Sequence, residues 1–504
     1  MRSNYFQKIL NNSLWIIILL ILIGCNNSEK FFSSRSSIKI LHEIEDKIYI
    51  NIYMSNNLDP KFKQVQNSFI EIINNSKNLC EKEIDYEIVK INDNDSINGK
   101  YIYNPLSHLN MHPIWINMDH QKYNKIYPYA TINYKGKQSN IKLLNSKIYD
   151  TIYELDEKIL EESINDLEYN FFKSLYLLKQ NKKKKIAFIH GHNELDSNNT
   201  WDIRNSLSEF YIIEDFDLTL FEINPIDNNI DIKKQIQKLQ EYKTIIIAKP
   251  DTNFDKIENI ILDQYVMNGG RILWLVDGTT AHMNNFNEDN YFILEKNSTN
   301  TENILNKYGV NINNDLILDD RCSKSPFYVQ NKIMFHDWKF NPILSNETDH
   351  LIINSCDSIL TNFCSSIEVI DKKKSTILLT SSLNSQSIIY GNKVSLEIIK
   401  SDRIDLNNKL TTGVLLEGVF ESAFPNIEYK DENFIFKKII KKNKMIIISD
   451  GDIIANIHEA PNKLYPLGFY HYKNNIFKGN KNFIINCLLY LCDDIDILNL
   501  KNRI

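Results

Sequence analysis

The segment Lys182–Asp196 reads KKKKIAFIHGHNELD and decides how the larger part of this chain is interpreted. Four lysines, most simply a solvated linker, precede the apolar run Ile186–Ile189, which ends at a turn that contains Gly191. A short apolar run that stops at a glycine-containing turn is typical of a buried β-strand. The segment therefore predicts that an α/β domain begins at Ile186.

Similar apolar runs recur along the chain with helical patterns between them. They are DFDLTLF (215–221), TIIIAKP (244–250), RILWLVDG (271–278) and KMIIISDGDII (444–454). Strands that alternate with helices favour right-handed βαβ units and a mostly parallel sheet. We therefore predict one α/β domain over residues 186–498. Its residues 320–443, which are richer in strand patterns, are interpreted as an inserted or appended β-rich region.

Residues 36–148 predict a smaller α/β domain. The order is a strand at 47–54, a helix whose apolar residues recur from Phe62 to Ile73, a second strand at 84–91 and a hairpin at 127–144. This order resembles a thioredoxin-like layout. The loop Met54–Asn57 has no CxxC, however, which excludes thiol redox chemistry. Residues 149–185 are predicted as an amphipathic helix, Ser163–Gln180, and the basic linker.

Residues 1–25 predict a signal or membrane-anchor segment. The apolar run Leu14–Ile23 is short for a bilayer span, which needs about 20 residues, and fits a signal-peptide core of about 7–15. The tetrapeptide Leu22–Cys25 resembles a lipobox, so Cys25 is a candidate for lipidation. An uncleaved signal anchor is the alternative. Both interpretations tether the chain to a membrane and place its bulk outside the cytoplasm.

Composition narrows the function classes. With 504 residues, 43% of them hydrophobic, the chain is long enough for two or three domains. A formal net charge of −6 gives no indication of a nucleic-acid partner. The seven cysteines contain no CxxC pair and no zinc-type spacing, and no GxxxxGK[ST] sequence occurs. We therefore predict no metal and no cofactor, and the chain is not an ATPase.

Seven blocks occur in a fixed order: YPYATINYKGK (127–137), DLEYNFFKSLYLLKQNKKKKIAFIHGHNEL (166–195), IIIAKP (245–250), LDQYVMNGGRILWLVDG (262–278), VLLEGVF (414–420), IISDGDIIAN (447–456) and PLGFYHY with GNKNFIINCLLYLCDD (466–472 and 479–494). Together they resemble those of a known family, the auxiliary subunit of the gliding-motility ABC transporter of Bacteroidetes (GldG-like). The loop Gly191–Glu194 departs from the family, which usually has GHGE there, because Asn193 replaces the second glycine.

The resemblance implies a periplasmic protein of substrate-binding type, anchored to the inner membrane. Such a protein works with a separate ABC ATPase and a separate permease. It also implies that the larger domain is a doubly wound, glutamine-amidotransferase-like sheet, similar to a fold of intraflagellar-transport proteins. Any ligand, a small molecule or a glycan, is left open.

Loops follow four of the predicted strands, at Gly191–Glu194, Lys249-Pro250, Asp277-Gly278 and Asp450–Asp452. The candidate residues in these loops are Gly191, His192, Glu194, Asp277, Asp450 and Asp452. If the strands are parallel, these residues line one edge of the sheet, where open α/β sheets bind ligands. They are our candidate ligand or interaction crevice. In the simpler alternative each aspartate only caps its own turn. A metal site at His190, His192 and Glu194 is not predicted, because the Gly191 turn breaks the strand geometry.

Asp450-Gly451-Asp452 raises one alternative function. A strand that ends in DxD resembles the magnesium site of haloacid-dehalogenase-like phosphatases, and Asp277 would supply a further carboxylate. In those enzymes the motif opens the domain, whereas Asp450 lies near the end of this one. A non-enzymatic transporter subunit is therefore the prediction, and a metal-dependent phosphohydrolase is the alternative.

Overall fold

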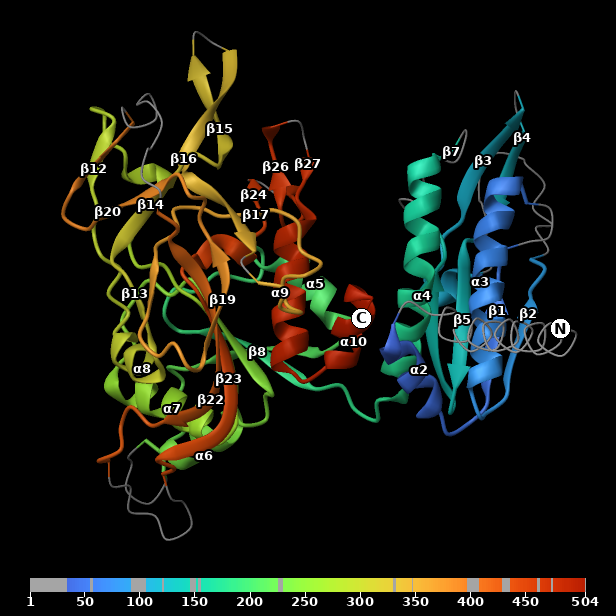
Figure 1. Cartoon of the computed structure of the whole chain (residues 1–504), viewed down its shortest axis with the longest axis horizontal. Helices are drawn as coiled ribbons and strands as arrows, with labels where there is room; N and C mark the ends of the chain where they lie inside the picture. Colours follow the sequence, from blue (N-terminus) through green and yellow to red (C-terminus); the bar gives the residue numbers. More distant parts are fainter. Residues whose placement is uncertain are drawn as a thin grey trace, which may run out of the picture. The chain divides into compact units, whose positions relative to one another are not determined.

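The computed structural model describes residues 34–503 except 55–57, 92–105, 120–121, 146–150, 153–155, 225–229, 330–331, 347, 397–407, 428–435, 460–462 and 473–474 (Figure 1). The predicted N-terminal segment with Cys25 lies outside the described residues. No helix among those described combines the length and apolar character that a membrane span needs. The chain divides into two compact units, 1–182 with 499–504, and 183–498.

The smaller unit is built on a four-stranded sheet in the order β2-β1-β5-β6. Strand β1 pairs in parallel with β2 and antiparallel with β5. The elements of this unit are α2 (Arg35–His42), β1 (Ile48–Ile52), α3 (Pro60–Leu79), β2 (Ile84–Ile88), β3 (Ile114–Asp119), β4 (Lys122–Ile126), β5 (Tyr129–Tyr134), β6 (Lys137–Lys142), β7 (Thr151–Ile152) and α4 (Glu157–Lys179). The thioredoxin-like assignment of residues 36–148 stays a prediction.

Local chemistry explains two features of this unit. Lys135 and Gly136 both have positive φ, 49° and 73°, as the tight turn between β5 and β6 requires. Helix α4 begins at Glu157, after the Asp156 cap, so the predicted start at Ser163 is wrong. Ser163 is a buried residue inside the helix, and its hydroxyl donates to the Ile159 carbonyl instead of capping a helix end.

The larger unit is organised around a ten-stranded sheet. Its path is β15-β16-β19-β22-β23-β11-β10-β8-β9, with β17 paired to β16. The first half of the unit contains β8 (Lys185–His190), α5 (Trp201–Ser208), β9 (Ile212–Asp217), α6 (Ile232–Leu239), β10 (Thr244–Ala248), α7 (Lys256–Met267), β11 (Arg271–Leu275), η3 (Met283–Asn285), β12 (Tyr291–Ile293), α8 (Glu302–Tyr308), β13 (Val310–Ile312) and β14 (Asp315–Asp319).

The second half contains β15 (Cys322–Val329), β16 (Lys332–Asn346), β17 (Ile359–Leu360), β18 (Ile367–Val369), β19 (Ser375–Thr380), β20 (Ser385–Ile389), β21 (Lys393–Ser395), β22 (Thr411–Glu421), β23 (Ile439–Ile448), η5 (Gly451–Ile454), β24 (His458–Glu459), β25 (Lys463–Leu464), β26 (Phe469–Tyr470), β27 (Asn475–Ile476), α9 (Lys478–Leu491) and α10 (Ile495–Asn502). These helices and strands together confirm the predicted α/β class.

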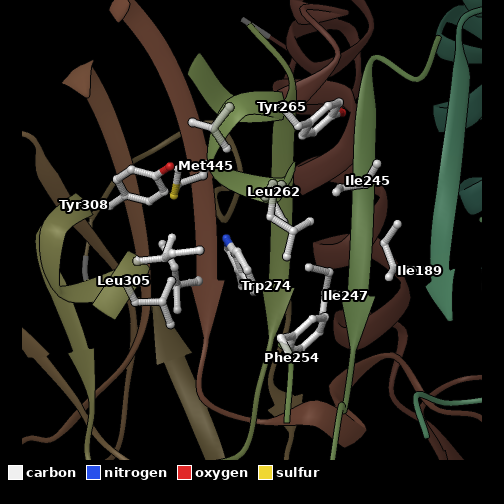
Figure 2. Packing of buried hydrophobic residues seen from close by; sticks show 14 of the residues in the cluster. Ile189, Ile245, Ile247, Phe254, Leu262, Tyr265, Trp274, Leu305, Tyr308 and Met445 are labelled. Atoms are coloured by element: carbon white, nitrogen blue, oxygen red, sulfur yellow. The ribbon is translucent and has the colours of Figure 1, made fainter. Parts of the chain in front are cut away.

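The five strands predicted from apolar runs pair in parallel: β23 with β11, β11 with β10, β10 with β8, and β8 with β9. Figure 1 shows α6, α7 and α8 on one side of these strands and α5 and α9 on the other. Strands β8, β10 and β11 are thus buried on both faces, which explains their nearly continuous apolar sequences, whereas the edge strand β9 stays partly exposed. In Figure 2, Trp274 of β11 lies in the core beside Leu262 of α7.

One difference from the sequence-based prediction has a local cause. Strand β9 ends at Asp217, so the predicted strand 215–221 begins and ends too late. The chain turns there because the Asp217 carboxylate accepts a hydrogen bond from the Thr219 backbone at 2.9 Å. The β-rich region takes part in the same sheet. Antiparallel strands β22, β19, β16 and β15 extend the parallel part directly.

Candidate functional site

The loops that follow β8, β10, β11 and β23 lie at one edge of the sheet, because these strands run parallel. Backbone hydrogen bonds join neighbouring strand ends there. Leu195 donates to Ala248 at 3.0 Å, and Asp251 donates to His192 at 3.0 Å. Val276 donates to Ile448 at 3.0 Å. The predicted site residues therefore start from adjacent positions, and their side chains decide what they form.

Three predicted aspartates meet in one place. The Asp277 carboxylate accepts a hydrogen bond from the Gly451 backbone at 2.6 Å. Asp450 accepts from the Asp452 backbone at 2.8 Å. Asp452 binds the Lys249 ammonium at 2.5 Å, and the same ammonium is 4.0 Å from Asp277. We call Lys249, Asp277, Asp450 and Asp452 the aspartate–lysine cluster.

Asn362 joins this cluster from the loop after β17. Its backbone N–H donates to the second Asp450 oxygen at 2.9 Å, and its side-chain amide donates to Asp452 at 2.9 Å. Both Asp450 oxygens are thus occupied by backbone donors, and the side chain is completely buried. The simpler alternative, in which each aspartate only caps its own turn, accounts for the hydrogen bond from the Asp452 backbone to Asp450. It omits the contact with Asn362, which is distant in the sequence.

The position of Lys249 depends on two unusual backbone features. Lys249 has a φ of 58°, a left-handed conformation that L-residues rarely adopt. Its side chain also lies against Gly451, where an added Cβ would be 2.6 Å from the Lys249 Cβ. Glycine at 451 therefore permits the close approach. Sequence analysis predicts the Lys249-Pro250 loop at this edge but does not include Lys249 among the candidate residues, although a basic residue directly after a buried strand is a usable signal. Nothing local marks Asn362.

Burial and mutual charge interactions shift the pKa values of Asp277, Asp450 and Lys249. Burial, repulsion from Asp452 and only partial compensation by Lys249 raise the pKa of Asp277 from 3.8 to about 7. Burial and the charges of Asp277 and Asp452 raise the pKa of Asp450 well above its ordinary value. Burial lowers the pKa of Lys249, but the neighbouring aspartates outweigh it and raise this pKa overall. The ammonium is thus the fixed charge around which the carboxyl groups titrate.

His192 and Glu194 form a second, separate cluster. The His192 imidazole is 2.9 Å from the Glu258 carboxylate and 3.6 Å from that of Glu194, and its ring stacks on Phe254 with centroids 3.8 Å apart. Glu194 also accepts from the His192 backbone at 2.7 Å. Burial opposes a charge on the imidazole, but the two carboxylates prevail and raise the pKa of His192 to about 9.

This second cluster fixes the loop after β8 to helix α7. Glu258 is the third residue of α7, and its carboxylate also accepts from the Asp255 backbone in a capping box. Asn193 has a φ of 56°, which explains why glycine or asparagine suits that position. Gly191, with a φ of 121°, makes the turn itself. The geometry of these residues is that of a loop anchor.

The histidines of the loop do not converge on one point. His190 contacts Asp215 at 2.8 Å, whereas His192 contacts Glu258. Across the described residues no group of three or more His, Cys, Asp or Glu side chains is arranged to hold a metal ion. The phosphohydrolase alternative gains no support either. A nucleophilic aspartate must reach substrate, and Asp450 is fully buried with both oxygens engaged.

A pocket of about 410 Å³ opens beside the aspartate–lysine cluster. Of the six predicted residues only Asp452 lines it, together with Asn362 of the same cluster. Its other walls come from the loop before α5, from β15 and β16, from the β26 hairpin and from the start of α9. The pocket therefore lies between the parallel strand ends and the β-rich region.

Comparison with known proteins gives one family match that covers more than half of the chain. A family described as "ABC-type uncharacterized transport system" matches residues 183–487, and a domain of unknown function matches residues 28–133. No curated protein matches the chain. The mmIFT52 N-terminal domain is 16% identical, covers 61% of this chain and 97% of its own, and has a TM-score of 0.35. A putative ThuA-like protein from Parabacteroides merdae is 11% identical, covers 62% and 90%, and has a TM-score of 0.25.

Proposed function

Because the chain belongs to the family of ABC-type uncharacterized transport systems, we propose that it is a membrane-tethered, extracytoplasmic auxiliary subunit of an ABC transporter. The proposal specifies a substrate-binding subunit of a gliding-motility-type transporter at the inner membrane. The family match supports the ABC-transport part of this proposal, and the resemblance of the seven sequence blocks supports its gliding-motility type. The family match covers residues 183–487, nearly the whole of the larger compact unit, 183–498, so the shared feature is a complete folded body.

A division of labour follows from the proposal. The printed sequence has no GxxxxGK[ST] loop, so ATP hydrolysis is assigned to a separate subunit. Transport across the bilayer is assigned to a separate permease. The larger unit would then act by binding, without chemistry of its own. The closed arrangement of Asp450 between two backbone donors supports that non-enzymatic role.

The tether is assigned to residues 1–25. The apolar run that ends at Cys25 supports a lipid anchor or an uncleaved signal anchor. Mass spectrometry of the mature N-terminus distinguishes the two modes. An acylated cysteine at the first position identifies the lipoprotein, and an intact segment identifies the anchor. A mature chain that lacks residues 1–25 and carries no lipid would contradict the tether.

Affinity purification tests the partnership. The chain with a C-terminal tag is expressed in its own host, membranes are dissolved in a mild detergent, and bound proteins are identified by mass spectrometry. We expect an ABC ATPase and a multi-span permease at similar abundance. The same preparation from an untagged strain serves as control. Recovery of the tagged chain without either subunit would refute the transporter role.

A second assay separates binding from catalysis. The purified chain is incubated with p-nitrophenyl phosphate and Mg²⁺, and we expect no turnover above the buffer blank. Turnover that disappears in Asp450→Asn would establish the phosphohydrolase alternative. The residue is chosen because the strand-end DxD resemblance names it as the nucleophile.

A further inference from the structure

The pocket beside Asp452 has walls that are joined by partly buried hydrogen bonds. The Asn480 side chain holds the backbone N–H and carbonyl of Leu360 at 2.9 and 2.8 Å. The Tyr470 hydroxyl accepts from the Lys324 backbone at 2.5 Å and joins the β26 hairpin to β15. These bonds connect segments that are far apart in the sequence. The pocket is therefore a formed feature of the fold, and its volume lies within the range of small-molecule sites, about 300–1,000 Å³.

Several polar atoms that line the pocket keep free hydrogen-bonding capacity. Within the described part of the chain, Asp452 Oδ1 and the Asn362 amide oxygen have no hydrogen-bond partner, and both accept. Asn341 uses its amide oxygen for the Phe363 backbone at 3.3 Å, which leaves its NH₂ group as a donor. Ser325 adds a hydroxyl that can do either.

The charged groups around the pocket are already compensated. Asp452 is paired with Lys249 at 2.5 Å, and Lys324 is paired with Asp337 at 2.5 Å. An anionic ligand would meet the Asp452 carboxylate, and a cationic ligand would compete with Lys249 for it. A neutral ligand meets neither cost.

One wall is apolar and aromatic. Phe469 stacks on Tyr465 with centroids 4.2 Å apart and an angle of 22° between the rings, so its orientation is held. It lines the pocket together with Met283. A ligand that suits this site is neutral, carries both donors and acceptors, and presents a C–H face to an aromatic ring. Those properties together describe a sugar.

We infer that this pocket binds a neutral sugar, a monosaccharide or the end of an oligosaccharide, with its hydroxyl groups on Asp452, Asn362, Asn341 and Ser325. The Phe469 wall packs against the C–H face of the ring. The site deepens the proposed function, on which it rests, because it names the substrate class that a substrate-binding subunit would present to its permease.

A glycan array tests the inference with the purified full-length chain. The array carries neutral and acidic mono- to tetrasaccharides, and the strongest neutral glycan is then titrated calorimetrically. Ser325→Trp fills the pocket, and Asp452→Asn keeps its shape but removes a charged acceptor. Ser387→Trp, on an exposed position of β20 outside the pocket, is the matched control. Thermal unfolding of each variant verifies that it is folded.

We expect neutral glycans to bind. Affinity should fall about tenfold in Asp452→Asn, as expected for one hydrogen bond to a charged group. Binding should be abolished in Ser325→Trp and unchanged in Ser387→Trp. The inference is overturned if no neutral glycan binds, if only acidic glycans bind, or if folded Ser325→Trp binds like the native chain.

Failure of this inference and failure of the proposed function give different results. The tagged native chain can recover its ATPase and permease and still bind no sugar, which removes the ligand class alone. It can also bind sugar and recover neither subunit, which removes the transporter role alone.

Discussion

Replacing Asp277 by asparagine should make the larger unit less sensitive to pH. Asp277 is only 8% exposed, and its Oδ1 accepts from the Gly451 backbone at 2.6 Å. An asparagine oxygen can keep that hydrogen bond while the charge is lost. The native carboxyl group has a pKa raised from 3.8 to about 7. A raised folded pKa stabilises the protein at low pH, and this stabilisation is lost as the pH rises through the folded value.

The magnitude follows from that shift. One pKa unit corresponds to about 1.4 kcal/mol, so the full effect of Asp277 is at most about 4 kcal/mol. Between pH 5 and pH 8 the native chain should lose about 2–3 kcal/mol of unfolding free energy through this group. An asparagine side chain does not titrate, so Asp277→Asn does not show this pH-dependent loss of unfolding free energy. The variant should therefore gain about 2–3 kcal/mol relative to the native chain over this pH interval.

Urea unfolding followed by tryptophan fluorescence measures the effect. Trp201, Trp274 and Trp338 lie in the larger unit, so the signal reports mainly on it. Asp251→Asn, at an exposed carboxyl group of the same sheet edge, is the control and should change stability equally at both pH values. A difference between Asp277→Asn and native protein that is the same at pH 5 and pH 8 would refute the argument.

Three further predictions concern buried groups. His192→Gln should destabilise the chain by about 3 kcal/mol at pH 6, because the pKa of His192 is raised to about 9. The stability that this shift contributes is fully present below pH 6.5 and is lost as the pH rises through 9. Denaturation at pH 6 and pH 10 checks that the stability difference between variant and native chain narrows, and an equal difference would count against the prediction. Gly451→Ala should cost about 1–3 kcal/mol through the clash with Lys249, measured by thermal unfolding, and an unchanged melting temperature would show that Lys249 moves freely. Asp263→Ala should lower the unfolding free energy by about 3–5 kcal/mol, because the buried carboxylate accepts hydrogen bonds from four donors. A loss below about 1 kcal/mol, measured by urea unfolding, would contradict that role.

The sequence predicts the secondary structure of the central sheet well. Runs such as Thr244–Ala248 and Arg271–Leu275 are strands that begin at the expected residue and end two or three residues before the expected end. The turn at Lys135 and Gly136 was also foreseeable, since few residues tolerate positive φ. The errors of the sequence-based prediction lie at the ends of helices and strands. The predicted start of α4 at Ser163 failed because a serine inside a helix bonds its own backbone as readily as it caps one.

The candidate site was only partly accessible to sequence reasoning. Asp277, Asp450 and Asp452 lie together in the structure, because parallel strands bring their ends to one edge. His192 and Glu194 start from the same edge, but His192 contacts Glu258 at the first turn of α7, and Glu194 contacts His192. No spacing in the sequence shows which neighbour a loop side chain will contact.

By itself the sequence determined the class of the fold, the parallel strands and the edge at which polar residues collect. Those properties depend on local periodicity and on the chirality of strand–helix–strand connections, which act over short stretches of chain. The tertiary structure alone decided that Lys249 neutralises the aspartates and that Asn362 closes over Asp450. Such contacts depend on the order of strands in the sheet. That order is set by the burial of both sheet faces at once, a property of the whole core and of no single segment.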